Sequence, residues 1–328
     1  MISIRKINFP KLLIFSIVSL SLIKCSVSKS DFVSPLGDIK SPKDNPLDTA
    51  KIALGKEFFF DKRLSLDESI SCAVCHKPGL AFTDGLKFSD GILGRKSGRN
   101  SPTLLNAAFL PKLMFDGEIP TLEMQSIVPI QDHNEMGMDI KELLVRLKAV
   151  PEYQAAAKRI FNREMDVWVL SRSLAAYQRS LISDNSPFDK FYYGKKKMAM
   201  SASAKRGWTI FSEKLYCTKC HPAPYFTTSR VENIGLYEIY PDNGRFRINN
   251  DSTEMGKFKV PTLRNIQITN PYMHDGSYES LSDVIDHYAS GGKNHKNKSS
   301  IIQPFTLTKK EKNDLIEFLY SLTDMSFM

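Results

Sequence analysis

The chain has 328 residues, enough for two domains, and its 42% hydrophobic and 25% charged residues are ordinary for a globular protein. The formal net charge is +9. No arginine-rich or aromatic-interleaved basic run accompanies this charge, so we do not expect nucleic acid as a partner.

The N-terminus has the pattern of an export signal. Basic residues precede an apolar run over residues 12–23, which is short for a membrane span. We therefore expect a signal peptide over residues 1–24 and a periplasmic protein. Cys25 follows, and two interpretations stay open: a lipidated cysteine that tethers the protein to a membrane, or a plain cleaved signal. The Ser-, Lys- and Pro-rich composition of residues 25–45 predicts a linker.

Helical patterns alternate with long loops along the rest of the chain. Residues 78–111 and 225–260 are rich in turn residues such as Gly and Asn, so we expect loops there. Residues 185–197 end in three lysines and are expected to form a junction between domains. Helices are expected, in chain order, over residues 48–61, 138–148, 151–161, 166–182, 281–289 and 308–322.

Two short cysteine motifs carry the strongest chemical signal. The first is Cys72-Ala73-Val74-Cys75-His76, and the same arrangement returns at Cys217-Thr218-Lys219-Cys220-His221. Such units attach c-type haem, because two thiols bond the vinyl groups while the adjacent imidazole binds the iron. A zinc ribbon also uses paired cysteines, but it needs no histidine directly after each pair. The two motifs use four of the five cysteines and predict two covalently bound c-type haems.

One haem motif in each half suggests one domain per haem. Residues 204–211, before the second motif, echo residues 53–59, before the first, as a weak internal repeat. We therefore expect a mainly α fold of two cytochrome c-like haem domains with long loops, over residues 46–194 and 195–328. Ser71 is expected to cap the short helix of the first motif. Export agrees with this interpretation, because bacterial c-type haem is attached outside the cytoplasm.

Further stretches accompany the haem motifs: residues 99–106 (RNSPTLLN), 115–117 (FDG), Gln125 with Pro129, 135–137 (EMG), 258–265 (FKVPTLRN) and 271–276 (PYMHDG). Together they resemble the bacterial di-haem cytochrome c peroxidase family, from about residue 48 to the C-terminus. The resemblance implies that the first haem meets hydrogen peroxide and that the second receives electrons from a small c-type cytochrome or cupredoxin. The oligomeric state stays open, with a homodimer as one alternative.

The resemblance assigns acid–base work at the first haem to Glu135 and Gln125. A carboxylate beside the iron can take a proton from peroxide and return it to the leaving oxygen, while Gln125 could orient the peroxide. Many relatives place a second histidine in the loop after the first motif, but no histidine lies between His76 and His133 here. We therefore expect an open, five-coordinate iron, as in the MauG-like branch, with a ligand swinging in from His133 as the alternative.

The second iron is expected to be six-coordinate. Electron-transferring members carry Met at the position that matches Tyr288, whereas the MauG-like branch has Tyr there, as this chain does. A tyrosinate ligand favours ferric iron and lowers the reduction potential, while Met raises it. Tyr288 is therefore the expected distal ligand, with Met273 and Met255 as alternatives and His287 as a neighbour.

Other matches and departures concern the region between the haems. Phe115 stands where family members usually carry Trp, and Leu215 stands where the tryptophan-quinone maturase has a Trp that relays oxidising equivalents. Phe is much harder to oxidise than Trp, so we do not expect electron hopping through Phe115. Leu215 argues against tryptophan-quinone maturation of a partner protein. The family binds calcium between its domains; Asn100 matches its side-chain ligand, and Thr269 and Pro271 match positions that give backbone carbonyls.

These inferences favour a peroxidase that reduces hydrogen peroxide to water at the His76 haem, with electrons entering through the His221 haem. Two alternatives stay open. One is a MauG-like oxidase that uses peroxide to modify a protein or small molecule. The other is a plain electron-transfer cytochrome without peroxide chemistry.

Overall fold

The computed structural model describes residues 33–327, so the expected signal peptide and Cys25 lie outside the described part of the chain. Within that part, helices and loops dominate, in agreement with a mainly α fold. The sheet is one antiparallel pair, β1 (Val231–Glu232) with β2 (Phe258–Lys259). None of the described helices is both long enough and apolar enough to cross a membrane.

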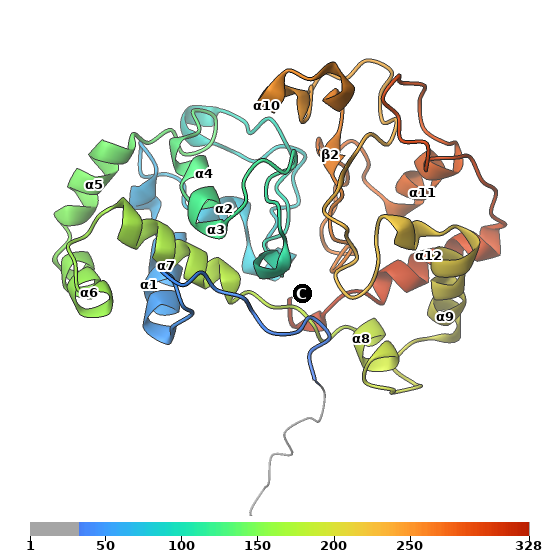
Figure 1. Cartoon of the computed structure of the whole chain (residues 1–328), viewed down its shortest axis with the longest axis horizontal. Helices are drawn as coiled ribbons and strands as arrows, with labels where there is room; N and C mark the ends of the chain where they lie inside the picture. Colours follow the sequence, from blue (N-terminus) through green and yellow to red (C-terminus); the bar gives the residue numbers. More distant parts are fainter. Residues whose placement is uncertain (1–32, 328) are drawn as a thin grey trace, which may run out of the picture. The chain divides into compact units, whose positions relative to one another are not determined.

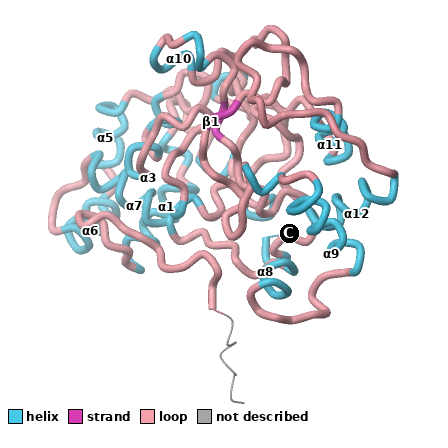
Figure 2. The backbone as a smooth tube through the Cα atoms, turned by 45° about the vertical axis from the view of Figure 1, so that its right-hand side comes forward, coloured by secondary structure: helices cyan, strands magenta, loops and turns pink. Residues whose placement is uncertain are grey.

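Long loops separate the helices along most of the chain (Figure 2). A π-helical turn over Ile210–Lys214 precedes the second cysteine motif, and a 3-10 turn over Cys217–Lys219 begins it. The α-helices are α1 (Thr49–Phe60), α2 (Cys72–Cys75), α3 (Leu122–Gln125), α4 (Val128–Gln131), α5 (Ile140–Lys148), α6 (Pro151–Phe161), α7 (Val167–Arg179), α8 (Pro187–Tyr192), α9 (Ala202–Thr209), α10 (Phe246–Asn249), α11 (Leu281–Ala289) and α12 (Lys309–Tyr320).

The six predicted helices are all present as α1, α5, α6, α7, α11 and α12. Side-chain caps set several of their starts: Asp48 accepts hydrogen bonds from the first turn of α1, and Asp139 does the same for α5. Helix α7 ends before its predicted limit, because the chain turns so that the Leu181 carbonyl accepts from the Asn106 amide. The prediction for Ser71 was wrong: it stands at the N-cap of α2, but its side chain makes no capping hydrogen bond.

Two large apolar cores and one small cluster, around Leu113 and Leu122, lie in the described part of the chain. The first is built by α1, α5, α6 and α7 around fully buried residues such as Phe58 and Leu143. The second is built by α8, α9, α11 and α12 around Phe188 and Phe318. Figure 1 shows these two groups of helices on opposite sides of the ribbon. Helix α8 therefore packs with the second group, and the expected boundary between residues 194 and 195 stays a prediction.

The internal repeat reappears as a repeated packing contact. A Cβ on Gly55 in α1 would lie 1.9 Å from the carbonyl oxygen of Ser173 in α7. In the same way, a Cβ on Gly207 in α9 would lie 1.9 Å from the carbonyl oxygen of Asp314 in α12. Each helix pair thus crosses at a glycine, because only a residue without a side chain lets the backbones approach so closely. The similar sequences before the two cysteine motifs, residues 53–59 and 204–211, therefore correspond to these two equivalent helix crossings.

Candidate haem sites

The first cysteine motif forms α2 and the residue that follows it. Cys72 and Cys75 are free thiols, and burial raises their pKa to about 12 and about 11. His76 Nδ1 lies 2.9 Å from the carbonyl oxygen of Phe82. Because a carbonyl can only accept, this hydrogen bond places the proton on Nδ1 and leaves the lone pair on Nε2 for a metal. A histidine oriented in this way is suited to bind iron.

The second motif repeats this arrangement. Cys217 and Cys220 are free, and burial raises the pKa of Cys217 to about 12. His221 Nδ1 lies 2.9 Å from the carbonyl oxygen of Phe226, so its Nε2 is also available. Burial lowers the pKa of His221 to about 4, partly offset by the carbonyls of Phe226 and Pro261, and the ring is therefore neutral. A neutral imidazole is the form that binds a metal.

These features fit c-type haem in both halves: two free thiols, then a neutral imidazole with a free Nε2. They do not fit a zinc ribbon, because among residues 33–327 no group of three or more His, Cys, Asp or Glu side chains converges on a metal position. The cysteines and histidines of both motifs are only half-buried by surface area, although burial dominates the shifts in their pKa.

The loop behind each histidine is held by a threonine that the sequence analysis treated only as a family marker. Thr103 Oγ1 donates to the carbonyl oxygen of Ala81 at 2.6 Å, and Thr262 Oγ1 donates to that of Tyr225 at 2.8 Å. Each acceptor directly precedes the phenylalanine whose carbonyl receives the histidine hydrogen bond. In the sequence, the signal for this role is a threonine three residues before an asparagine, in residues 102–106 and again in residues 261–265. The role itself depends on contacts between residues that are distant in sequence.

Glu135 lies close to the first motif. Its negative charge contributes to the raised pKa of both Cys72 and Cys75, after burial as the main cause. Burial, with a smaller contribution from Asp132, raises the pKa of Glu135 itself to about 7. Its backbone carbonyl accepts from Ile92 at 2.9 Å, which ties this segment to the long loop after α2. The carboxyl is half-buried, and its segment is held against the loop that follows the first motif.

The two other residues expected near the first haem, Gln125 and His133, lie in different surroundings. Gln125 ends α3, its Nε2 contacts Met114 Sδ at 4.0 Å, and its Oε1 is buried without a protein partner. His133 is exposed, and its Nδ1 lies 3.2 Å from Arg95 Nη1. An unpartnered amide oxygen is available to a ligand, whereas the imidazole of His133 is engaged at the surface. The open coordination of the first iron stays a prediction.

Tyr288, in α11, lies near the second motif. Burial raises its pKa above the ordinary value, and the charges of Cys220 and Cys217 contribute next. The neighbouring His287 is turned elsewhere, since its Nε2 lies 3.2 Å from the carbonyl oxygen of Ile234. Of the alternative ligands, Met273 has a left-handed backbone, with φ 75°. Met255 directly follows the 3-10 turn Ser252–Glu254. Tyr288 as the distal ligand of the second haem stays a prediction.

Of the remaining expected residues, Phe115 and Asn100 contact the other half of the chain. The Phe115 carbonyl accepts from the Lys259 amide at 2.5 Å, which joins the loop before α3 to β2. The Asn100 amide donates to the His274 carbonyl at 2.8 Å, close to the cis peptide Asn270-Pro271. The calcium site of Asn100, Thr269 and Pro271 stays a prediction. Leu215 packs at the edge of the second core.

Comparison with known proteins gives the family. Residues 49–197 match the family model described as di-haem cytochrome c peroxidase. Methylamine utilization protein MauG of Methylorubrum extorquens is 38% identical over 288 residues, which cover 87% of this chain and 81% of that protein. The chain belongs to the di-haem cytochrome c peroxidase family.

Other relatives of this di-haem family span both of its branches. Cytochrome-c peroxidase IdrP1 of Pseudomonas sp. strain SCT is 36% identical over 327 residues, covering 89% of this chain and 85% of that protein. The solved structure of a MauG-like protein associated with microbial copper homeostasis superposes with a TM-score of 0.82 at 32% identity, covering 90% of this chain and 95% of that chain. Membership confirms the predicted family and implies two c-type haems.

Proposed function

We propose that the chain is a periplasmic peroxidase that reduces hydrogen peroxide to water at the first haem. Electrons enter at the second haem from a small c-type cytochrome or cupredoxin. The observation that carries this proposal is the half-buried Glu135, whose segment contacts the loop after the first motif, together with the unpartnered amide oxygen of Gln125. A plain electron-transfer cytochrome has no use for a poised acid–base group at one haem only.

The protein's part in the reaction is proton transfer and orientation. When bound, the first haem supplies the iron that takes up peroxide and passes two electrons to it. Glu135 removes a proton from one peroxide oxygen and returns it to the other, which leaves as water. With a pKa of about 7, both protonation states of Glu135 are populated near neutral pH, as this dual role requires. The Gln125 Oε1 accepts a hydrogen bond from the peroxide and fixes its orientation.

A MauG-like oxidase, which uses peroxide to modify another molecule, is the second candidate. The 38% identity to a MauG protein and the position of Tyr288 near the second motif favour it. Leu215 and Phe115 oppose a tryptophan relay to a protein substrate, because neither side chain is readily oxidised. The two candidates share the first-haem chemistry and differ in where the electrons come from.

Peroxide added to the purified, fully oxidised holoprotein tests the proposal. We expect a high-spin ferric signal at rest, reaction without prior reduction, and sustained turnover with a reduced small cytochrome. A long-lived oxidised species without turnover would support the oxidase instead, and no spectral change with peroxide would overturn both. His133→Ala serves as the control for coordination: it should leave the resting spectrum unchanged, whereas a change from low to high spin would identify His133 as a ligand.

A further inference from the structure

Two matching segments, residues 102–106 (PTLLN) and 261–265 (PTLRN), hold the loops behind the two iron-binding histidines and differ at one position. In each, a threonine hydroxyl holds the loop and accepts a hydrogen bond from the amide two residues later, at 3.1 Å in both halves. That later residue is Leu105 in the first half and Arg264 in the second. Leu105 is buried in the first apolar core, and Arg264 is equally buried, at 2% exposed. A charged group therefore occupies, at the second haem only, a position that the fold fills elsewhere with leucine.

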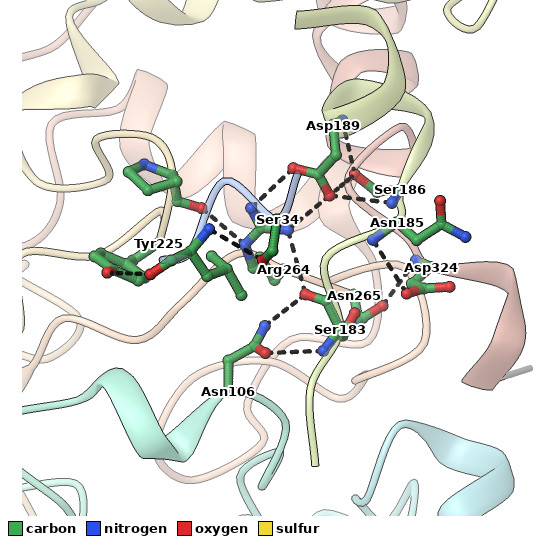
Figure 3. Close-up of polar contacts among 12 residues, drawn as sticks. Ser34, Asn106, Ser183, Asn185, Ser186, Asp189, Tyr225, Arg264, Asn265 and Asp324 are labelled. Atoms are coloured by element: carbon green, nitrogen blue, oxygen red, sulfur yellow. Dashed lines mark hydrogen bonds and ion pairs between the residues drawn. The ribbon is translucent and has the colours of Figure 1, made fainter. Parts of the chain in front are cut away.

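The charge of Arg264 is fully paired inside the protein. Its Nη1 and Nη2 each donate to one oxygen of Asp189 in α8, both at 2.9 Å, and Asp189 is completely buried. The carboxylate is fixed in turn by the amide and hydroxyl of Ser186, at 3.0 and 2.7 Å (Figure 3). A bidentate pair of this kind fixes the orientation of the guanidinium as well as its position.

The third contact of Arg264 leads to the second haem. Its Nε donates to the carbonyl oxygen of Pro224 at 2.7 Å, and its guanidinium lies 5.8 Å from the ring centre of Phe226. Phe226 supplies the carbonyl that receives the His221 hydrogen bond, and its backbone is left-handed, with φ 52°. A non-glycine residue seldom adopts that conformation unless surrounding contacts hold it there. Arg264 is one of those contacts.

We propose that Arg264, held by Asp189, is a positioning residue for the second haem: it fixes the Pro224–Phe226 loop so that the Phe226 carbonyl orients and polarises His221. A firm hydrogen bond to Nδ1 makes the imidazole a stronger donor to the metal, and stronger donation stabilises ferric iron and lowers the potential. This inference rests on the two haems that the family implies and does not depend on peroxide activity.

Stability alone does not account for the pair. Replacing a buried ion pair by well-packed apolar residues is often neutral or stabilising, because both charges lose their hydration on burial. Leu105 shows that this fold accepts an apolar side chain at the equivalent position. The pair also sits against the segment between the two cores, since Arg264 Nη1 lies 3.4 Å from the Ser183 carbonyl, which accepts from Asn106 Nδ2 at 2.7 Å. The second-haem loop is thereby anchored to the first half.

The test is the paired substitution Asp189→Asn with Arg264→Leu in the full-length holoprotein. The net charge is unchanged, so a direct effect of charge on the haem is minimised. We expect two haems per chain and a folded protein, with a raised reduction potential and altered electron paramagnetic resonance g values for the second haem only. The iron–histidine stretching frequency of the second haem, read by resonance Raman in any high-spin form, should fall.

Two further variants make the outcome decisive. Arg264→Lys retains a positive charge but loses the forked geometry and the Nε donor, so it should shift the second-haem potential in the same direction by a smaller amount. Arg179→Leu with Glu123→Gln removes another buried ion pair, from the first half, and should leave the second haem unchanged. Wild-type potential and g values in folded Arg264→Lys and in the paired variant would overturn the proposal. If the paired variant does not fold, Arg264→Lys alone decides.

Discussion

Glu135→Gln separates the chemical role of this side chain from its effect on folding. The substitution preserves the size of the group and removes its capacity to ionise. We expect it to slow peroxide cleavage by about 10²–10⁴-fold, the usual contribution of a positioned acid–base group. Haem content should not change, because Glu135 bonds neither motif.

The same substitution should stabilise the protein at high pH. Burial and the charge of Asp132 raise the pKa of Glu135 from 4.5 to about 7. At about 1.4 kcal/mol per pKa unit, this is roughly 3 kcal/mol of preference for the protonated form in the folded chain. Since the folded pKa exceeds the unfolded one, the free energy of unfolding of the wild type falls as pH rises between these values. Gln cannot ionise, so the variant escapes this loss.

Two measurements check the prediction. Stopped-flow peroxide reaction from pH 5 to 9 should show a wild-type rate that rises with an apparent pKa near 7, a limb that the variant lacks. Urea unfolding should give equal stabilities near pH 4 and a more stable variant above pH 7, by up to about 3 kcal/mol. Asp132→Asn is the matched control: it keeps the acid–base group, and the rate limb should move to lower pH at an undiminished maximum.

Two outcomes would refute this reasoning separately. A variant that retains the wild-type rate and pH limb shows that another group moves the proton. Equal stabilities of wild type and variant at pH 8 show that the carboxylate is well solvated in the holoprotein, so that its burial does not raise its pKa.

The remaining predictions concern attachment and helix packing. Cys72→Ala and Cys217→Ala should each lose about one haem equivalent per chain by pyridine haemochrome assay, and a zinc-loaded protein without a Soret band would contradict the haem interpretation. Gly207→Ala should lower the free energy of unfolding by about 1–3 kcal/mol, because the new Cβ would overlap the Asp314 carbonyl. Gly79→Ala, where a Cβ meets nothing within 4 Å, is its control and should be near neutral.

The long helices could be predicted from sequence because periodicity and capping residues act locally. Helices α3, α4, α8, α9 and α10 were missed, since segments of four to eight residues carry too little periodicity to be distinguished from loops. The haem-binding residues followed from spacing alone. Glu135 and Gln125 came from family resemblance, because a pocket carboxyl has no local signature.

The supporting residues were beyond sequence reasoning for a different reason. Thr262 and Arg264 act on a loop some 40 residues earlier, through contacts that depend on the folded backbone. A buried ion pair such as Arg264 with Asp189 is also invisible in a single sequence, where each partner resembles a surface charge. The matching Leu105 becomes informative only once the two loops can be superposed.

The duplicated glycine crossings create a recognition problem during folding. Helices α1 and α9 each offer a glycine to a partner helix, so α9 could also pair with α7, and α1 with α12. The residue before the glycine is Leu54 in α1 and Arg206 in α9, and Arg206 donates to Asp314 of α12 at 2.7 and 2.6 Å. In an exchanged pairing the buried Asp314 would face leucine and keep only the ion pair with Lys310 of its own helix. The wrong assembly would therefore lose both charge-assisted hydrogen bonds from Arg206 and be disfavoured. We expect this one ion pair to keep each helix with its own partner, so that each haem-attachment motif is presented by a correctly assembled half.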